Sequence, residues 1–352
     1  MYRFAFLHSE LSGYFLECLR ALAEHPQVKQ CLVFHWPVQD EAPFELQFAT
    51  GIEHVERIAY STSDVASVAD RLSEFQPDVV VTSGWRDPCY YQVAKSLRRT
   101  NPVVCSLDNA WAGSWRQWLA VAARWRLHRR FTHLWVSGPD QYEYARRMGY
   151  ASDRIMTGVY AAHVAPFHAA YHRSDTIRPR TLLYVGRIVK EKQAVPLYEI
   201  FHDLTDDERA GWKLRIVGTG DLAHLVKSTS ICSVEGFRQP AELPGIAQQA
   251  GAYVLPSRFE PWGVTVQEFA AAGLPMLCSR QCGAAGAFVN SGYNGWTFDA
   301  TDHSQLRSSL VRLLTADEEV RTQMGRRSHE LSLQNSPELW ATRLVNLAES
   351  ER

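Results

Sequence analysis

The stretch FEPWGVTVQEFAAAGLPMLCS, residues 259–279, passes from a loop into a helix and then into a strand. The apolar run Ala252–Leu255 before it predicts a short buried strand, and the prolines and glycine at 256–263 predict the loop. Val264–Ala272 has the composition of a helix, which Gly273 and a nearby proline are expected to end. The pattern predicts one strand–loop–helix unit of an open parallel sheet.

Two glutamates frame the start of this predicted helix. Glu260 lies on the loop at the carboxyl end of the strand, where open parallel sheets bind ligands, and Glu268 lies just over one turn inside the helix. The free backbone N–H groups near Gly263, Val264 and Thr265 favour a phosphate or an oxyanion. Ionised carboxylates accept hydrogen bonds from sugar hydroxyls. We therefore expect a ligand that carries both phosphates and hydroxyls, such as a nucleotide-sugar.

The composition is that of a globular chain. Its 352 residues suggest two domains of similar size, and 46% of them are hydrophobic, enough for two cores. The chain lacks the uninterrupted apolar run of about 18 residues that a membrane-spanning helix needs. The N-terminal residues 1–7 lack a signal-peptide pattern and predict the first strand instead. A net charge of −1 gives no support for nucleic acid as a partner.

Cysteine and metal-binding patterns are uninformative. The seven cysteines include no C-x-x-C pair, and we expect them to be free thiols in a reducing cytoplasm. Cys278 and Cys282 have no cluster of histidines or cysteines around them that would complete a zinc site. Neither D-x-D nor H-E-x-x-H occurs, so no metal cofactor is expected.

Strand and helix patterns alternate along the whole chain, which predicts parallel sheets with helical crossovers and an α/β fold. Predicted strands are Arg3–Leu7, Cys31–His35, Val55–Ile58, Val79–Thr82, Val103–Ser106, His133–Val136, Leu182–Val185, Leu214–Val217, Cys232–Glu235, Ala252–Leu255 and Met276–Cys278. The expected organisation is an N-terminal Rossmann-like domain at 1–165, a linker at 166–180, a second Rossmann-like domain at 181–335, and a helix at 336–352 that packs back on the first domain.

Five spaced motifs between residues 180 and 330 resemble a known family. They are the E-x7-E pair, Gly186-Arg187 with the later Glu191-Lys192, Ile216-Val217-Gly218-Thr219-Gly220, Gly236-Phe237 with Leu243-Pro244, and Gly292-Tyr293-Asn294-Gly295. Together they resemble the retaining glycosyltransferases of family 4, typified by sucrose-phosphate synthases and by mannosyl- and glucosyltransferases. The resemblance implies the glycosyltransferase-B (GT-B) architecture, in which two Rossmann-like domains face each other across a cleft.

The resemblance implies roles for particular residues. The donor would be a nucleoside-diphosphate sugar, with Arg187 and Lys192 on its diphosphate, Glu260 on its sugar and Glu268 on its ribose. Arg187, Lys192, Glu260 and, in the first domain, Asp108 form the expected catalytic set. The expected nucleotide-sugar contacts besides Glu268 are Gly186, Gly236, Phe237, Gly263, Val264, Thr265, Gly218 and Gly13. The first domain would hold the acceptor.

Gly218-Thr219-Gly220 with the later Ala223 also imitates a dinucleotide fingerprint, G-x-G-x-x-A, and Glu235 ends the next predicted strand as a ribose-binding acid would. Asp221 would place a like charge beside a pyrophosphate, which argues against this alternative.

A segment rich in tryptophan and arginine follows the fifth predicted strand. Trp111, Trp115, Trp118 and Trp125 recur at helical spacing, and five arginines but no acidic residue lie between Asp108 and Asp140. A core helix with a basic outer face is the plainest interpretation. Alternatively, Trp111, Trp115 and Arg116 contact a membrane surface or stack on an acceptor sugar.

Asp108 takes the place of a histidine that meets the donor sugar in many relatives. An ionised Asp108 would accept hydrogen bonds from sugar hydroxyls and favour a developing oxocarbenium ion. The alternative is that Asp108 caps a helix beginning near Trp111.

We therefore expect a cytoplasmic retaining glycosyltransferase, hexosyltransferase-like and peripheral on the inner face of the membrane. It would act in polysaccharide biosynthesis and transfer a sugar to a saccharide or lipid-linked saccharide of the cell envelope. A nucleotide-sugar epimerase of the same fold and a non-catalytic donor-binding subunit of a glycosylation complex are the alternatives.

Overall fold

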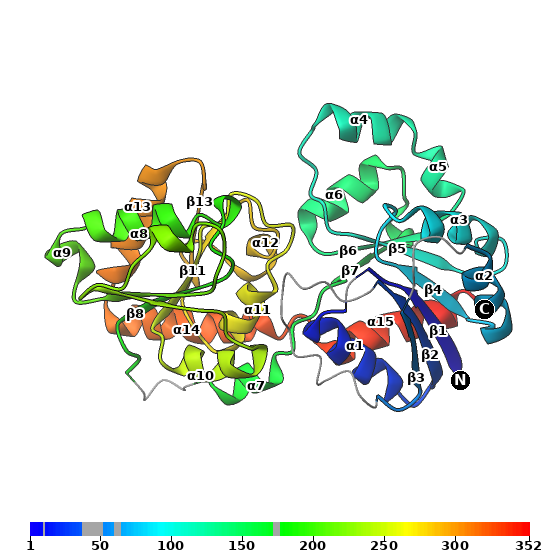
Figure 1. Ribbon diagram of the computed structural model, residues 1–352, viewed down its shortest axis with the longest axis horizontal. Coiled ribbons are helices and arrows are strands. Elements are labelled where there is room, and N and C mark those ends of the chain that lie inside the picture. The colour runs from blue at the N-terminus through cyan, green and yellow to red at the C-terminus, as the bar shows by residue number, and fades with distance from the viewer. Residues whose placement is uncertain (10, 37–51, 60–64, 172–176) are drawn as a thin grey trace. The chain divides into compact units, whose positions relative to one another are not determined.

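The computed structural model describes residues 1–9, 11–36, 52–59, 65–171 and 177–352. These residues form two compact units: unit 1 comprises Met1–His163 with Asn335–Arg352, and unit 2 comprises Val164–Gln334. Each unit is a parallel β-sheet accompanied by helices (Figure 1). The expected α/β fold with two parallel-sheet domains is confirmed.

The sheet of unit 1 has the strand order β3-β2-β1-β4-β5-β6-β7, and its neighbouring strands are all parallel. Its strands are β1 (Tyr2–Leu7), β2 (Val28–His35), β3 (Val55–Ala59), β4 (Val79–Thr82), β5 (Val103–Leu107), β6 (His133–Val136) and β7 (Ile155–Thr157). Its helices are α1 (Gly13–Ala23), α2 (Val65–Phe75), α3 (Pro88–Leu97), α4 (Trp115–Ala122), α5 (Trp125–His128), α6 (Pro139–Arg147) and α15 (Pro337–Ser350).

The central strand β1 feeds two cores because successive side chains of a strand point to opposite faces. Phe4 and Phe6 join a buried cluster with α1 and α15, whereas Ala5 and Leu7 join a second buried cluster with α2, α3 and α6. A sheet that is buried on both faces explains why its strands are nearly continuous apolar runs.

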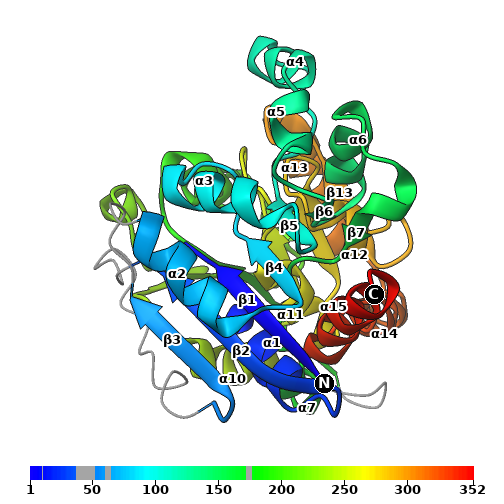
Figure 2. The same cartoon turned by 90° about the vertical axis from the view of Figure 1, so that its right-hand side faces the viewer.

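The C-terminal helix α15 completes the first of these cores. The Trp340 ring stacks on Phe6 at 5.8 Å and on Trp135 at 4.9 Å between centroids, and its indole N–H donates to the carbonyl of Val159 at 2.9 Å. The helix lies beside α1 (Figure 2). The last residues of the chain are thus part of unit 1.

The sheet of unit 2 has the strand order β10-β9-β8-β11-β12-β13, and its neighbouring strands are also parallel. Its strands are β8 (Thr181–Val185), β9 (Lys213–Val217), β10 (Cys232–Glu235), β11 (Ala252–Leu255), β12 (Met276–Ser279) and β13 (Gly295–Phe298). Its helices are α7 (Ala165–Ala169), α8 (Ala194–Asp203), α9 (Asp206–Arg209), α10 (Leu243–Gln248), α11 (Val264–Ala271), α12 (Ala285–Phe288), α13 (His303–Leu314) and α14 (Glu318–Ser332).

The start of unit 2 differs from the predicted linker at 166–180. Helix α7 overlaps that range at residues 166–169 and belongs to unit 2, since the buried Phe167 packs edge-on against Phe269 of α11 at 5.8 Å. The proline-punctuated composition concealed this short helix. Residues 172–176 of the predicted linker lie outside the described residues.

Candidate functional site

The predicted donor-site residues of unit 2 follow different strands of one sheet. Arg187 comes after β8, Gly218 after β9, Gly236 after β10 and Glu260 after β11. Because all these strands are parallel, their carboxyl ends meet at one edge of the sheet, where α/β folds bind ligands.

Lys192 and Glu260 are in direct contact at this edge. The ammonium of Lys192 forms an ion pair and a hydrogen bond with the Glu260 carboxylate, and the two side chains are only 14% and 17% exposed. The backbone ties the two loops together as well, because the N–H groups of Arg258 and Phe259 donate to the carbonyl of Glu191 at 2.7 and 3.4 Å. The structure thus brings together two of the four predicted catalytic residues.

The loop that carries Glu260 is held on its other side by the turn after β12. The Glu260 N–H donates to the carbonyl of Gln281 at 3.3 Å, and the Gly283 N–H donates to the carbonyl of Glu260 at 3.0 Å. The Ala284 N–H donates to the carbonyl of Trp262 at 2.8 Å. The loop that carries Glu260 is therefore held between the loop after β8 and the turn after β12.

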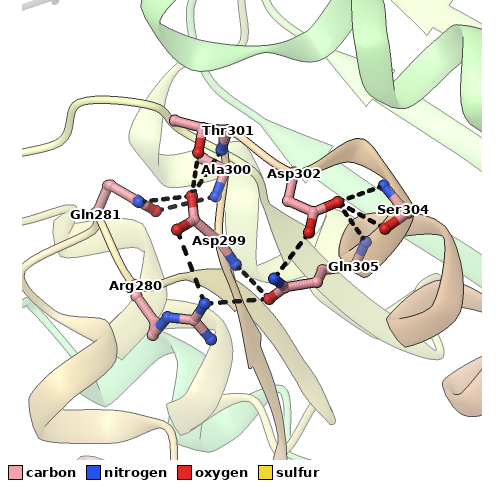
Figure 3. A network of polar contacts seen from close by, with 8 residues as sticks. All are labelled: Arg280, Gln281, Asp299, Ala300, Thr301, Asp302, Ser304 and Gln305. Carbon is pink, nitrogen blue, oxygen red and sulfur yellow. Dashed lines mark hydrogen bonds and ion pairs between the residues drawn. The ribbon is translucent and has the colours of Figure 1, made fainter.

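A polar network anchors that turn in its place (Figure 3). The Gln281 side-chain amide donates to Asp299 at 3.0 Å and its oxygen accepts from the Ala300 N–H at 3.0 Å. Asp299 also accepts from the hydroxyl and N–H of Thr301 at 2.7 and 2.8 Å, and these bonds lower the pKa of its carboxyl group. Sequence reasoning missed Gln281 and Asp299, because their link depends on β13, which it did not predict.

Arg187 occupies a more open position than Lys192. Its side chain is exposed, and its carbonyl accepts a hydrogen bond from the hydroxyl of Tyr184 at 2.8 Å, which fixes the turn after β8. Among the described residues, no carboxylate forms an ion pair with this guanidinium. Arg187 is therefore a cation at the sheet edge whose charge is not neutralised within the described part of unit 2.

The N-terminus of α11 lies directly behind Glu260. Gly263 has a left-handed φ of 90°, and a Cβ there would lie 2.9 Å from the Cys282 sulfur and 3.0 Å from Cγ of Glu260. Only glycine suits this backbone and this spacing. No described side chain caps the helix. The first turn of α11, at Val264 and Thr265, thus has backbone N–H groups of the kind that bind an anion.

Glu268 lies in the second turn of α11. The residue is partly buried, and burial of its carboxyl group raises the pKa to about 7. No cation of the described residues forms an ion pair with it. A carboxyl group with a pKa near 7, in the helix that follows the carboxyl edge of a parallel sheet, is a candidate functional group.

Gly218 and Gly186 allow two turns to touch. A Cβ on Gly218, whose φ is 147°, would lie 1.9 Å from the carbonyl oxygen of Gly186. The Gly186 N–H donates to Val217 at 3.0 Å, and the Ile188 N–H donates to Thr219 at 2.7 Å. Close packing of the two loops therefore accounts for the glycine at 218.

The same region contradicts the dinucleotide alternative. The segment after Gly220 contains only a 3-10 turn, Ala223–Leu225, so no helix N-terminus faces a pyrophosphate there. The carboxylate of Glu235 is already engaged, because it accepts from Arg215 at 2.7 Å and from Arg238 at 3.1 Å. Gly236 and the partly exposed Phe237 follow it at the end of β10, the terminal strand on this side of the sheet.

Asp108 follows β5 at the carboxyl edge of unit 1's sheet. The hydroxyl of Tyr160 donates to its carboxylate at 3.1 Å, and the amide of Gln141 donates to its carbonyl at 3.0 Å. The capping alternative is wrong, because α4 begins only at Trp115 and Ser114 caps it together with Gln117. Gly13, the other predicted site residue of this unit, begins α1, and a Cβ there would meet no described atom within 4 Å.

The interpretation of residues 111–125 as a core helix is also wrong. None of the residues of α4 is buried, and the helix is interrupted at residues 123–124, between α4 and α5. Trp111 is partly buried and packs against Tyr144 at 5.3 Å, whereas Trp115 is exposed, with the Arg116 guanidinium 5.4 Å from its ring centroid. The larger apolar side chains of α4 therefore point away from the core of unit 1.

Three further observations concern the described residues. No group of three or more histidine, cysteine, aspartate or glutamate side chains among them is arranged to hold a metal ion. The helices of the described segments include none long and apolar enough to cross a membrane. The seven cysteines are buried and form no disulfide within the described segments.

Two family models match most of the chain. The model described as "Glycosyl transferase 4-like domain" matches residues 18–157, and the model described as "Glycosyl transferases group 1" matches residues 171–331. They correspond to the main parts of unit 1 and unit 2.

Relatives and solved structures agree with these models. Glycogen synthase of Mycobacterium tuberculosis is 31% identical over 173 residues, which cover 46% of this chain but only 39% of the relative. An uncharacterized glycosyltransferase of Methanocaldococcus jannaschii is 25% identical over 43% of this chain and 42% of its own length. The chain thus matches about two fifths of the length of these relatives.

Similarity of fold extends over the whole chain. HepE of Anabaena in complex with UDP and glucose superposes with a TM-score of 0.75 at 14% identity, over 99% of this chain and 100% of that one. Sucrose-phosphate synthase of Thermosynechococcus elongatus gives 0.74 at 16% identity over 99% of each chain. Both are GT-B structures. The chain therefore carries a glycosyl transferase 4-like domain followed by a glycosyl transferases group 1 domain, and its fold is GT-B.

Proposed function

We propose that this protein is a retaining glycosyltransferase that moves a sugar from a nucleoside-diphosphate sugar to an acceptor hydroxyl. The observation that carries the proposal is the Lys192–Glu260 pair, which lies beside the uncapped N-terminus of α11 at the ligand-binding edge of unit 2. A cation, a carboxylate and free backbone N–H groups are the groups that a sugar diphosphate requires. HepE, a structural neighbour, has been solved with UDP-glucose.

We assign the diphosphate to Arg187 and Lys192, which would stabilise the charge that builds on the leaving phosphate. Glu260 would accept hydrogen bonds from the transferred sugar, and Glu268 from the ribose hydroxyls. The base would meet the backbone of Gly236 and Phe237. The N–H groups around Gly263 would touch sugar or phosphate. In unit 1, Asp108 would accept from hydroxyls of the transferred sugar.

The reaction that we propose retains the configuration at the anomeric carbon. The bond from the anomeric carbon to the diphosphate breaks, and the acceptor hydroxyl attacks on the same face while a leaving phosphate oxygen takes its proton. The negative charge of Glu260 or Asp108 near the developing oxocarbenium ion would favour the transition state over the ground state. The charges of Arg187 and Lys192 would take the place of a divalent ion on the diphosphate, so no metal cofactor is invoked.

We further propose a saccharide or lipid-linked saccharide as acceptor, with action in polysaccharide biosynthesis at the inner face of a membrane. The observation that supports this location is the exposed surface of α4, where the Arg116 guanidinium lies 5.4 Å from the centroid of the exposed Trp115 ring.

A thermal-shift screen across UDP-, GDP-, ADP- and dTDP-sugars tests donor binding. One of them is expected to raise the melting temperature, because a ligand at about 100 times its dissociation constant stabilises the fold by about 2.7 kcal/mol. The same donor should give little shift with Lys192→Met and a normal shift with Lys227→Met, a variant at an exposed lysine elsewhere in unit 2. If no nucleotide-sugar shifts the wild type, the proposed donor class is wrong.

Product analysis then separates the proposed activity from its alternatives. The proton NMR coupling of the new anomeric centre should show the configuration of the donor, as retention requires. A changed sugar formed without acceptor would identify an epimerase. Donor binding with no turnover on any saccharide or lipid-linked acceptor would favour a non-catalytic subunit.

A further inference from the structure

The outer face of α4 exposes large apolar side chains. Trp115, Trp118 and Leu119 are 68, 54 and 59% exposed, and Trp125 at the start of α5 is 49% exposed. Residues 115, 118 and 119 share one face because helix neighbours are three and four positions apart. The opposite face carries Ala120 and Val121, which pack against the core of unit 1. The larger apolar face thus points outward.

Hydrogen bonds and ring packing hold this exposed face in position. The Ser114 hydroxyl accepts from the Gln117 N–H at 3.3 Å, while the Gln117 side chain accepts from the Ala112 N–H at 2.8 Å and donates to Ala110 at 2.7 Å. Trp118 packs edge-on against Trp111 at 5.2 Å. Figures 1 and 2 both show α4 standing out from the other helices of unit 1. A contiguous, ordered aromatic surface of this kind marks an interaction site.

Positive charge surrounds the indole rings. The guanidinium of Arg116 lies 5.4 Å from the Trp115 ring centroid, and that of Arg129 lies 4.7 Å from the Trp125 ring centroid. Arg126 lies 5.4 Å from the same Trp125 ring. No acidic residue occurs in the sequence from 109 to 139. The surface therefore combines exposed indoles with uncompensated arginines.

We propose that α4 and α5 form a docking surface for an anionic lipid bilayer, with the indoles at the headgroup level and the arginines on lipid phosphates. Indole rings favour the membrane–water interface, because the ring is apolar and its N–H is polar. Arginine binds phosphate through paired N–H groups. Charge selects this occupant. A second copy would bring the same positive surface against itself, and the segment lacks the carboxylates that bind sugar hydroxyls.

This docking surface depends on the proposed function in one respect only, namely that the enzyme would find a lipid-linked acceptor at the bilayer. Binding itself is measured without turnover. Failure of the wild type to transfer sugar would therefore refute the proposed function and leave the docking result standing, while loss of docking would leave the donor screen unaffected.

The experiment is co-sedimentation of the full chain with vesicles of phosphatidylcholine, with or without phosphatidylglycerol, over a range of salt concentrations. We expect binding to the anionic vesicles that declines as salt screens the arginines. Trp115→Ala with Trp118→Ala should weaken it by about tenfold or more at every salt concentration, since it removes the inserting rings. Arg126→Glu with Arg129→Glu should abolish its dependence on phosphatidylglycerol.

Matched controls separate the surface from general effects. Leu339→Ala removes another exposed apolar side chain of unit 1, and Lys227→Glu with Arg326→Glu makes the same change in net charge on unit 2. Both are expected to bind vesicles like the wild type. Melting temperatures should match in all variants, because the substituted side chains are exposed.

Four results would overturn the proposal. Wild-type protein could fail to bind anionic vesicles, or the tryptophan variant could bind them as well as the wild type does. Unchanged vesicle binding with a raised KM for a saccharide acceptor in the tryptophan variant would assign the surface to sugar stacking. A concentration-dependent dimer, lost in the same variant, would assign it to a second copy of the chain.

Discussion

Lys192 and Glu260, which lie 68 positions apart in the sequence, form a largely buried ion pair between the loops after β8 and β11. The charges of the two partners neutralise each other. A diphosphate that binds Lys192 must compete with Glu260 for the ammonium group, and the Glu260 carboxylate then needs another hydrogen-bond donor. A sugar hydroxyl beside Glu260 would be such a donor. The diphosphate and the sugar of one ligand thus suit Lys192 and Glu260, respectively.

We predict opposite effects on binding from the two partners. Lys192→Met should weaken donor binding and lower kcat by about two orders of magnitude or more, because a positioned charge on a leaving group is worth roughly 2.7–4 kcal/mol. Glu260→Gln should bind donor at least as tightly as the wild type, because it frees Lys192, yet should lose kcat. Isothermal titration with the donor and steady-state kinetics measure the two effects. Equal losses of affinity in both variants would contradict this division of roles.

Arg187 should be as important as Lys192 although it is exposed. Arg187→Ala is expected to lower kcat by about two orders of magnitude with little change in melting temperature, since no described carboxylate pairs with it. Lys190→Ala, at an exposed lysine three positions away, is the control and should be near wild type. Wild-type turnover should also persist in excess EDTA if Arg187 and Lys192 together hold the diphosphate, as we propose. Loss with EDTA and recovery with magnesium or manganese would show that a metal is needed after all.

Glu268 should make donor binding depend on pH. In the folded protein its pKa is raised by burial from 4.5 to about 7, so folding takes up a proton between these values. The free energy of unfolding therefore falls as pH rises through that window. Conversely, the ionised carboxylate is the better acceptor for ribose hydroxyls, so the donor should bind more tightly as pH rises through about 7.

Titration calorimetry with a nucleotide-sugar at pH 6 and pH 8 measures this effect. We expect the wild-type Kd to fall by several-fold to about tenfold between them, as ionisation of one group near pH 7 allows. Glu268→Gln cannot ionise, so its weaker binding should be nearly independent of pH. If the variant keeps the wild-type pH dependence, another group is responsible.

The structure shows how much the sequence could predict. The strand before Glu260, its loop and the helix Val264–Ala271 were predicted within a residue, because an apolar run, two prolines and a terminal glycine mark them locally. Strands β7 and β13 were missed. Both are the last strands of their sheets, and neither is a continuous apolar run, because Thr157 ends β7 and Gly295 and Thr297 interrupt β13.

The failure at α4 has a different cause. Trp115, Trp118 and Trp125 have the helical spacing of a core-facing stripe, and periodicity alone predicts their burial. The sequence does not say which side of the helix faces the protein, and here the small residues Ala120 and Val121 take the inner side. Likewise, the sequence predicts only that Lys192 and Glu260 lie at the same edge of the sheet. Their direct contact depends on the geometry of two loops, which the sequence pattern does not give.

Gln281 should act on catalysis by positioning Glu260. Its side chain is bound by Asp299 and Ala300, and its carbonyl accepts the N–H of Glu260. We expect Gln281→Ala to lower kcat by about tenfold while the KM for donor changes little. Asp299→Asn keeps an oxygen that can accept the same hydrogen bonds and should retain activity, whereas Asp299→Ala should not.

Asp302→Ala is the matched control, because Asp302 belongs to the same network but caps α13 instead of holding Gln281. Loss of this cap should lower the melting temperature slightly and leave kcat unchanged. If Asp302→Ala and Gln281→Ala reduce kcat equally, the network stabilises the unit as a whole and does not position Glu260.

Asp108 offers the sharpest test in unit 1, because the structure removes its alternative role as a helix cap. Its carboxylate accepts from the Tyr160 hydroxyl, so Asp108→Asn keeps an oxygen for that bond and removes only the charge. We expect the variant to keep its melting temperature and to lose at least about tenfold in kcat, since the charge would act on the developing oxocarbenium ion. Tyr160→Phe removes the hydrogen bond and keeps the charge, so it should cost less kcat than Asp108→Asn does. An Asp108→Asn enzyme with wild-type kinetics would reduce Asp108 to a hydrogen-bond partner of Tyr160.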